Sequence, residues 1–296
     1  MPDVAAAREV TAARLLKISA GNSYDPEVDI DWSAPQPAGV MYAPERRLSL
    51  HGTPLWDSLT PEQRVELSKH EVASIASIGI WFEVLLMRML LRHVSGMDPR
   101  SEHVQYALTE IGDECRHSIM FGRMIDAFGA PAYRPAAVHR ALGRYLGATA
   151  GGIQTFAAAL VAEEILDALQ REAMADESLQ PLVRMVSRIH VVEEARHIKF
   201  ARDELARQVA SAGRTRRLYC QIIVARAAYT VTHTLINPHA YAAVGLDPAR
   251  TREVAWANPH FRETLRWAGT RVTTYLQELG LVEGPAQRIW RAAALI

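Results

Sequence analysis

The chain has 296 residues, which is enough for one large domain with a substantial buried core. It carries 33 basic and 33 acidic side chains, so its formal net charge is zero. This balance excludes the excess of Lys and Arg that is typical of nucleic-acid-binding proteins and of polybasic membrane-surface proteins. A hydrophobic fraction of 49% and a charged fraction of 22% exclude disorder for most of the chain.

The cysteines and the start of the chain indicate the compartment. Cys115 and Cys220 are too few for a disulfide framework, which favours a reducing environment. The first residues lack the basic segment and apolar run of a signal peptide. The longest apolar stretch, residues 78–91, is interrupted by Glu83 and Arg88 and is too short to span a bilayer. We therefore expect a cytoplasmic protein without a membrane partner.

The predicted elements are helices almost throughout, because Ala, Leu, Arg and Glu dominate and no segment alternates like a strand. A short helix is expected within residues 1–18, and the prolines that follow predict an irregular arm. Thr60-Pro61-Glu62-Gln63 offers a capping box with Pro in the first turn, and the helix it starts should run to about Val94. Further helices are predicted over 98–128, over 135–175 with a bend at Gly151-Gly152, over 178–213, over 215–237, and in shorter pieces over 247–296.

Four long helices joined by short connections predict an all-α protein built on an antiparallel four-helix bundle. We expect residues 1–59 to form an N-terminal arm with a short helix and residues 60–213 to form the bundle. Residues 214–296 should add helices that pack on the bundle within a single domain.

Two segments of the predicted bundle repeat the pattern acid-Glu-x-Arg-His, at residues 113–117 and 193–197. A Glu and a His three positions apart lie on one face of a helix, so both can reach one metal ion. A single pair of this kind is more often a surface ion pair, but both of these pairs lie at or beside apolar helical stripes. Ionised groups are costly there unless they are paired or bind a metal. The motifs therefore predict metal ligands at Glu114, His117, Glu194 and His197.

The helix before each motif supplies one more carboxylate. Glu83 and Glu163 lie in apolar surroundings, and each precedes the Glu of its motif by 31 positions. A loop that differs by one residue would select Glu164 in place of Glu163. One Glu from each of two helices, with Glu-x-x-His from each of the other two, is the ligand set of a dinuclear carboxylate site.

His190 is a further predicted ligand. It lies four positions before Glu194 and seven before His197, so the three side chains share one helical face. The matching position in the first half of the bundle is Glu110, so the two halves differ there.

Charged residues beside the predicted ligands are candidates for a supporting shell. Asp113 and Glu193 precede the ligand glutamates, and Arg116 and Arg196 precede the histidines. Such groups can hydrogen-bond the free ring nitrogen of a ligand histidine and form ion pairs beneath the metal site. Solvated surface charge is the alternative interpretation.

This pattern resembles the ferritin-like di-iron oxygenases and, among them, the arylamine N-oxygenase family, typified by p-aminobenzoate N-oxygenase. The resemblance covers roughly residues 60–240. It implies a homodimeric enzyme with two iron ions per chain, or manganese in their place, which oxidises an amine nitrogen through hydroxylamine towards nitro. Dioxygen and an external electron donor would be required, and no Gly-rich nucleotide-binding fingerprint is evident. The family's four glutamate and three histidine ligands match Glu83, Glu114, His117, Glu163, His190, Glu194 and His197 of this sequence.

The residues around Glu83 that should face a substrate are apolar, and no arginine near them would bind a carboxylate. These neighbours are Ile78, Gly79, Ile80 and Met87. A more apolar or larger amine is therefore as compatible with the sequence as p-aminobenzoate.

Two other functions stay open. One is a di-iron oxygenase that acts at carbon by hydroxylation, desaturation or oxidative cleavage. The other is a ferroxidase or iron-storage protein, which the long arm and the extra C-terminal helices disfavour, because cage-forming ferritins are usually shorter chains.

Overall fold

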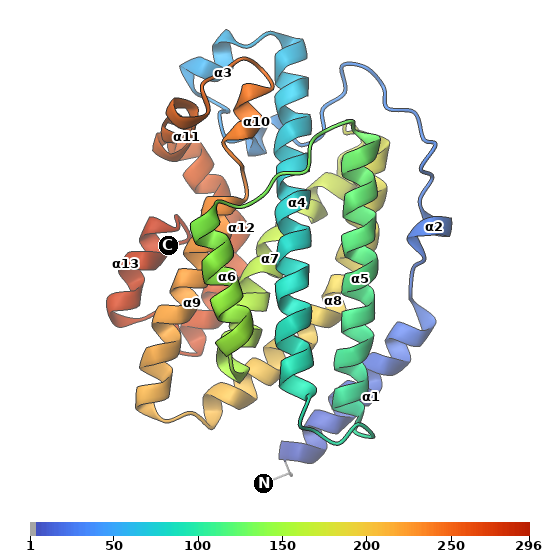
Figure 1. Ribbon diagram of the computed structural model, residues 1–296, viewed down its shortest axis with the longest axis vertical. Coiled ribbons are helices and arrows are strands. Elements are labelled where there is room, and N and C mark those ends of the chain that lie inside the picture. Colours follow the sequence, from blue (N-terminus) through green and yellow to red (C-terminus); the bar gives the residue numbers. More distant parts are fainter. Residues whose placement is uncertain (1–3) are drawn as a thin grey trace.

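The computed structural model describes residues 4–296, and every regular element in that range is a helix (Figure 1). The predicted all-α class is therefore confirmed. The α-helices are α1 (Val4–Gly21), α2 (Pro26–Asp29), α3 (Pro54–Ser58), α4 (Pro61–Val94), α5 (Glu102–Ala127), α6 (Ala137–Thr149), α7 (Gly152–Ala175), α8 (Pro181–Ala210), α9 (Arg214–Thr234), α10 (His239–Ala242), α11 (Pro248–Ala257), α12 (Pro259–Glu278) and α13 (Gln287–Ala292). Two short 3₁₀ helices lie at Glu45–Arg47 and Gly284–Ala286.

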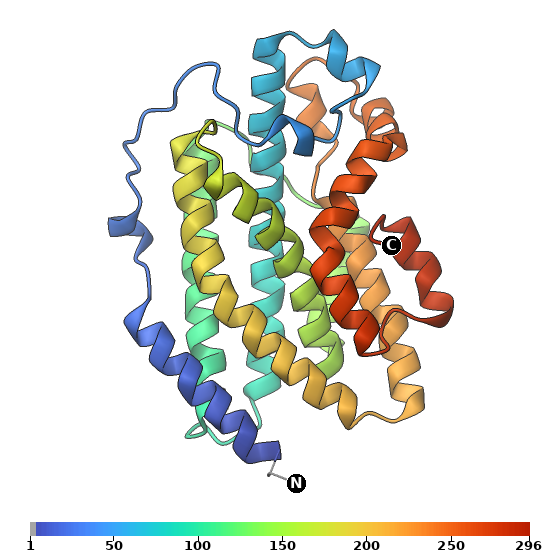
Figure 2. The same cartoon turned by 180° about the vertical axis from the view of Figure 1, so that it is seen from behind.

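The four longest of these helices form the bundle. α4 packs on α5 and α7 packs on α8, and the two pairs meet through contacts of α4 with α7 and of α5 with α8. α4 and α5 lie in front in Figure 1, and α8 crosses the front of the molecule in Figure 2, which shows the reverse side. α9 and α12 pack on α7, and α1 packs along α5 and α8.

The start of α4 agrees with the sequence pattern. The Thr60 hydroxyl accepts a hydrogen bond from the Gln63 backbone N–H at 3.3 Å, and the Gln63 side chain accepts one from the Thr60 N–H at 3.0 Å. The predicted capping box is therefore confirmed. The start predicted for the next helix was wrong by a few residues, because Ser101 caps α5. The Asp98 carboxylate instead accepts hydrogen bonds from the backbone and side chain of Arg100.

The helical region predicted over residues 135–175 is two helices, and its expected bend is a complete break. Ala150 is extended and Gly151 caps α7 without a side-chain hydrogen bond. The preceding helix, α6, lies outside the bundle against α4 and beside α9 (Figure 1). Gly143 allows this close approach, because a Cβ atom at that position would lie 2.5 Å from the Trp81 ring.

One helix, α4, is long and apolar enough to cross a membrane when judged by length and composition alone. In the structure 56% of its most apolar 18-residue window is buried inside the protein. Buried core helices of helical bundles have the same length and apolar composition.

Candidate metal centre

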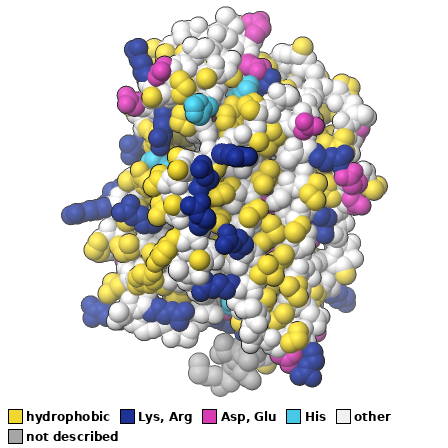
Figure 3. Space-filling model, viewed as in Figure 1, with side chains coloured by type: hydrophobic (Ala, Val, Ile, Leu, Met, Phe, Trp, Pro, Cys, Tyr) yellow, Lys and Arg dark blue, Asp and Glu magenta, His cyan; other side chains and the backbone are white. Residues whose placement is uncertain are grey.

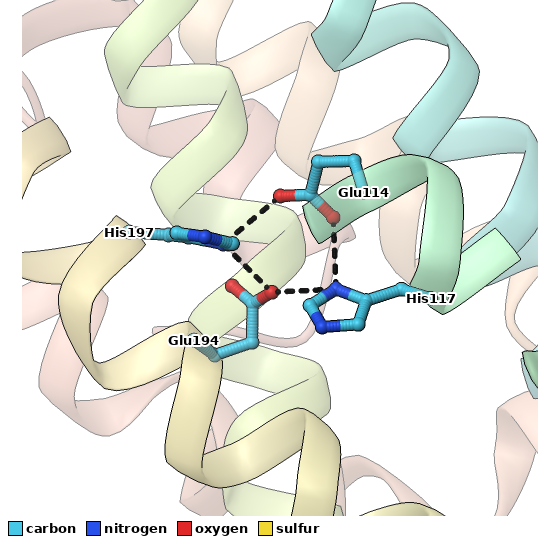
Figure 4. A group of neighbouring side chains, drawn as sticks. All are labelled: Glu114, His117, Glu194 and His197. Carbon is cyan, nitrogen blue, oxygen red and sulfur yellow. Dashed lines mark hydrogen bonds and ion pairs between the residues drawn. The ribbon is translucent and has the colours of Figure 1, made fainter. Parts of the chain in front are cut away.

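The bundle brings all seven predicted ligands into one buried cluster. α4 contributes Glu83, α5 contributes Glu114 and His117, α7 contributes Glu163, and α8 contributes His190, Glu194 and His197. None of them is more than 8% exposed. Figure 4 shows how Glu114, His117, Glu194 and His197 converge between α5 and α8.

Glu114 and Glu194 lie between the two histidines of the repeated motifs. His117 Nδ1 is 3.1 Å from Glu114 Oε2 and 3.3 Å from Glu194 Oε1. His197 Nδ1 is 3.0 Å from Glu194 Oε1 and 3.1 Å from Glu114 Oε1. Each carboxylate thus faces both histidines, which is the placement that a carboxylate needs in order to bridge two ions.

His190 extends the cluster towards α4. Its Nε2 lies 3.5 Å from Glu83 Oε1 and 3.6 Å from Glu194 Oε1. Its ring packs against those of His117 and Phe121, with centroid distances of 4.6 and 4.9 Å. Nitrogen and oxygen atoms of Glu83, His117 and His190 lie within 4.8 Å of one another, close enough to share one ion.

The two adjacent glutamates of α7 point in different directions. Glu163 is 8% exposed, and one of its oxygens lies within 4.8 Å of a Glu114 oxygen. Glu164 instead makes a two-pronged ion pair with Arg202 of α8, at 2.8 and 2.7 Å. The structure therefore brings Glu163 to the cluster and turns Glu164 away from it.

Several buried polar atoms of the cluster have no hydrogen-bond partner among the described residues. They include both carboxylate oxygens of Glu163, Oε2 of Glu194 and Nδ1 of His190. A buried acceptor without a partner is costly, and a cation bound by these atoms would remove that cost. The donor set of carboxylate oxygens and imidazole nitrogens therefore suits a dinuclear metal site.

Burial and charge within the cluster raise the pKa values of two of its glutamates and two of its histidines. Burial, reinforced by neighbouring carboxylates, raises the pKa of Glu83 and of Glu163 well above the usual range. Burial opposes ionisation of His117 and His197, but their contacts with Glu114 and Glu194 outweigh it and raise both histidine pKa values. So many carboxylates close together need positive charge among them.

The supporting acids reach the histidines crosswise between helices. His117 Nε2 on α5 lies 2.9 Å from Glu193 Oε2 on α8. His197 Nε2 on α8 lies 3.1 Å from Asp113 Oδ2 on α5. Each imidazole is thus held by its Nε2 and presents Nδ1 to Glu114 and Glu194, an orientation that second-sphere carboxylates commonly give to metal ligands.

Two arginines lie next to these acids. The guanidinium of Arg196, which is 5% exposed, is 3.4 Å from Asp113 and 3.5 Å from Glu193. Arg116 pairs with Asp113 from a more exposed position. The backbone N–H of Tyr24, in the N-terminal arm, donates to Glu193 at 3.1 Å, so the arm closes this side of the cluster.

Glu110 belongs to the cluster but is not among the seven predicted ligands. It is 2% exposed, and one of its oxygens lies within 4.8 Å of oxygens of Glu114 and Glu163. Burial raises the pKa of Glu110, and this effect outweighs the nearby charge of His197, which lowers that pKa. The signal was its position in α5, which matches that of His190 in α8.

An apolar cavity of about 250 Å³ reaches the cluster at Glu83, Glu163 and His190. α4, α6, α7 and α9 form its walls. Ile78 and Gly79 line it as the sequence suggested, whereas Ile80 and Met87 are not among its lining residues. Sequence reasoning missed the contributions of α6 and α9, because these helices carry no motif that links them to the ligands.

The comparisons with known proteins extend over most of the chain. The family model described as "P-aminobenzoate N-oxygenase AurF" matches residues 5–280. An uncharacterised protein of Mycobacterium tuberculosis and one of Mycobacterium bovis are each 27% identical over 290 residues, which cover 94% of this chain and 85% of the relative. Two solved mutants of R2-like ligand-binding oxidase with Mn/Fe cofactors are 14% identical, with TM-scores of 0.41 and 0.42, and the match covers 96% of this chain and 89% of theirs.

Proposed function

The chain belongs to the p-aminobenzoate N-oxygenase (AurF) family of di-metal oxygenases, and from this membership we propose that it oxidises the nitrogen of an arylamine. The first step would convert the amine, dioxygen, two electrons and two protons into a hydroxylamine and water. Further rounds would lead towards the nitro group. The structural observation that supports this proposal is the apolar cavity, which ends on Glu83, Glu163 and His190.

We assign the seven clustered residues as the ligands of two metal ions, and their carboxylate-rich donor set suits iron, with manganese as the alternative. Two iron ions held there would supply the reduction of dioxygen. Glu114 and Glu194 would help to hold the ions, because each of these carboxylates lies beside both motif histidines. Asp113 and Glu193 would hold the rings of His197 and His117 in place through their Nε2 atoms.

The cavity selects the substrate by excluding water. An arylamine is uncharged near neutral pH, so it enters an apolar cavity without losing the hydration of an ion, whereas an alkylammonium ion would lose it. Trp81 and Phe82 of α4 line the cavity and offer apolar ring surfaces to an aromatic substrate.

The cavity also argues against a carboxylate on the part of the substrate that it buries. Among its lining residues in the described chain Arg226 is the only basic one, and its side chain is exposed. An anionic group would therefore find no buried cation beside the cluster. A larger or more apolar arylamine fits this lining better than p-aminobenzoate does.

Three further proposals concern the surroundings of the enzyme. The electrons would come from an external donor. A homodimer is supported by exposed apolar side chains on α4 and α5, namely Val84, Leu91, Leu108 and Ile119. Figure 3 shows the face that these helices present, where hydrophobic side chains lie among basic ones. We place the protein in the cytoplasm because both cysteines are unpaired.

The test compares two substrates of nearly the same shape. The protein is loaded with Fe(II) without oxygen, exposed to air with a reductant, and offered 4-butylaniline or butylbenzene. The proposal predicts N-hydroxy, nitroso or nitro products from the amine and no product from the hydrocarbon. Oxidation at carbon in both compounds would establish a carbon oxygenase. A mineral core of many irons per chain, without organic product, would establish iron storage.

A further inference from the structure

The two halves of the bundle repeat with a constant offset. Glu83 and Glu163, Glu114 and Glu194, and His117 and His197 are each 80 positions apart. The supporting acids Asp113 and Glu193 and the arginines Arg116 and Arg196 follow the same offset. His190 corresponds by this offset to Glu110, so one position of the repeated site holds an imidazole in one half and a carboxylate in the other.

The structure places these two residues in different potential ligand groups of the cluster. His190, on α8, joins Glu83 and His117 of the α4–α5 pair in one potential ligand group. Glu110, on α5, joins Glu163 of the α7–α8 pair, together with Glu114, in another. Each residue thus reaches across to the lone glutamate of the other half.

Glu110 has the burial and the unpartnered carboxylate oxygen that are expected of a metal ligand. Its side chain is 2% exposed, and its Oε2 has no hydrogen-bond partner among the described residues. Both oxygens of the neighbouring Glu163 also lack a partner. Two buried carboxylates side by side without donors are unfavourable in a helical core unless a cation lies between them.

We propose that Glu110 is an eighth ligand and that it binds the same metal ion as Glu163 and His197, which we call the second ion. This proposal rests on the proposed ligand set. One metal position then has two histidines, His117 and His190, and the other has one histidine and an additional carboxylate. The second position is the harder and more negative of the two, so it should hold a hard, highly charged cation more strongly.

The experiment measures each metal position separately and does not depend on turnover. Wild type, E110Q, H190Q and E71Q are titrated with Fe(II) without oxygen, and the ⁵⁷Fe-loaded proteins are examined by Mössbauer spectroscopy. E71Q is the matched control, because Glu71 is a buried glutamate of α4 whose partner is Ser49 and not the cluster. Circular dichroism and thermal melting establish that each variant is folded.

We expect wild type and E71Q to bind two irons in two distinct environments of equal population. In E110Q the affinity for one Fe(II) should fall by more than the 10- to 100-fold that is typical when a supporting residue is replaced. The Mössbauer spectrum of this variant should lack one of the two iron environments. The Mössbauer spectrum of H190Q should lack the other iron environment. Two irons bound by E110Q with unchanged affinity and unchanged spectra would overturn the proposal.

A crystal structure of the metal-loaded wild type gives a second, independent answer if E110Q does not fold. Glu110 Oε within coordination distance of a metal supports the proposal, and an ion bound by Glu163 and His197 without Glu110 overturns it. This crystallographic result tests the ligand proposal independently of the proposed function. Two bound irons with Glu110 as a ligand but no amine oxidation would contradict the N-oxygenase proposal alone.

Discussion

The Nε2 of His197 on α8 lies 3.1 Å from Oδ2 of Asp113 on α5, and this contact ties together the two helices that carry the repeated motifs. The matching contact runs the other way, from His117 on α5 to Glu193 on α8. Each motif therefore supplies both a histidine and the acid that orients the histidine of its partner. Metal binding and the packing of α5 on α8 should be coupled through this pair of contacts.

Replacement of Asp113 by Asn tests that coupling. The amide keeps the shape of the side chain but lacks the charge that holds the His197 ring and faces Arg196. Metal affinity should fall by about 10- to 100-fold, as for other residues that orient a metal ligand. Anaerobic Fe(II) titration measures this loss, and unchanged affinity would show that Asp113 is only a structural ion-pair partner.

The neighbouring glutamates of α7 should respond differently to the same substitution. E163Q should abolish tight binding of one metal ion while leaving the fold intact, because Glu163 faces the cluster. E164Q should bind two ions but unfold more easily by about 2 kcal/mol, because it weakens the charged hydrogen bonds to Arg202. Metal analysis and urea unfolding of both variants provide the comparison, and the reverse pattern would assign Glu164 as the ligand.

The cavity walls on α9 allow a test of substrate size. Ala227 lines the cavity and lies on a helix that carries no proposed ligand. A227F should fill part of the space and weaken binding of 4-butylaniline at least tenfold, without loss of bound iron. R226Q is the companion variant, and it should change the dissociation constant of this uncharged amine less than twofold. Equal binding by A227F and wild type would place the substrate elsewhere.

The buried carboxyl group of Glu71 should make the folding stability of the protein depend on pH, independently of bound metal. Its carboxylate is buried and accepts hydrogen bonds from Ser49, whose hydroxyl also contacts Tyr241 at 2.9 Å. Burial raises the pKa of Glu71 to about 7 from an ordinary value of 4.5. The folded protein therefore keeps a proton that the unfolded chain releases, so its stability falls as pH rises from about 4.5 to about 7 and stays reduced above that range.

The substitution E71Q removes this titration. Relative to wild type, the variant should gain up to about 3 kcal/mol between pH 4.5 and pH 8. Urea unfolding of both proteins at several pH values measures the difference. A constant difference across this range would show that Glu71 titrates normally.

The clustering of the proposed ligands could be predicted because their geometry is local. Glu114 and His117 share a helical face through their spacing alone, and the equal separations in the two halves selected Glu83 and Glu163. The start of α4 could be predicted for the same reason, since its capping box lies within four consecutive residues.

The remaining features depend on contacts between helices, which spacing does not encode. The crosswise pairing of Asp113 with His197 requires the relative rotation of α5 and α8. The place of α6 depends on the close approach of Gly143 to Trp81, and the cavity depends on where α6 and α9 pack. Glu110 carried a sequence signal, its correspondence with His190, but its closeness to Glu163 follows only from the folded bundle.

The most direct test of the account is a single turnover with isotopically labelled dioxygen. Protein loaded with two Fe(II) per chain holds the two electrons that one hydroxylation requires, so no external reductant is added. It is mixed with ¹⁸O₂ and 4-butylaniline, and the products are analysed by mass spectrometry. We predict one ¹⁸O atom on the nitrogen of N-hydroxy-4-butylaniline. Label found only on carbon, or complete oxidation of the iron with no labelled product, would contradict the assignment of this protein as an N-oxygenase.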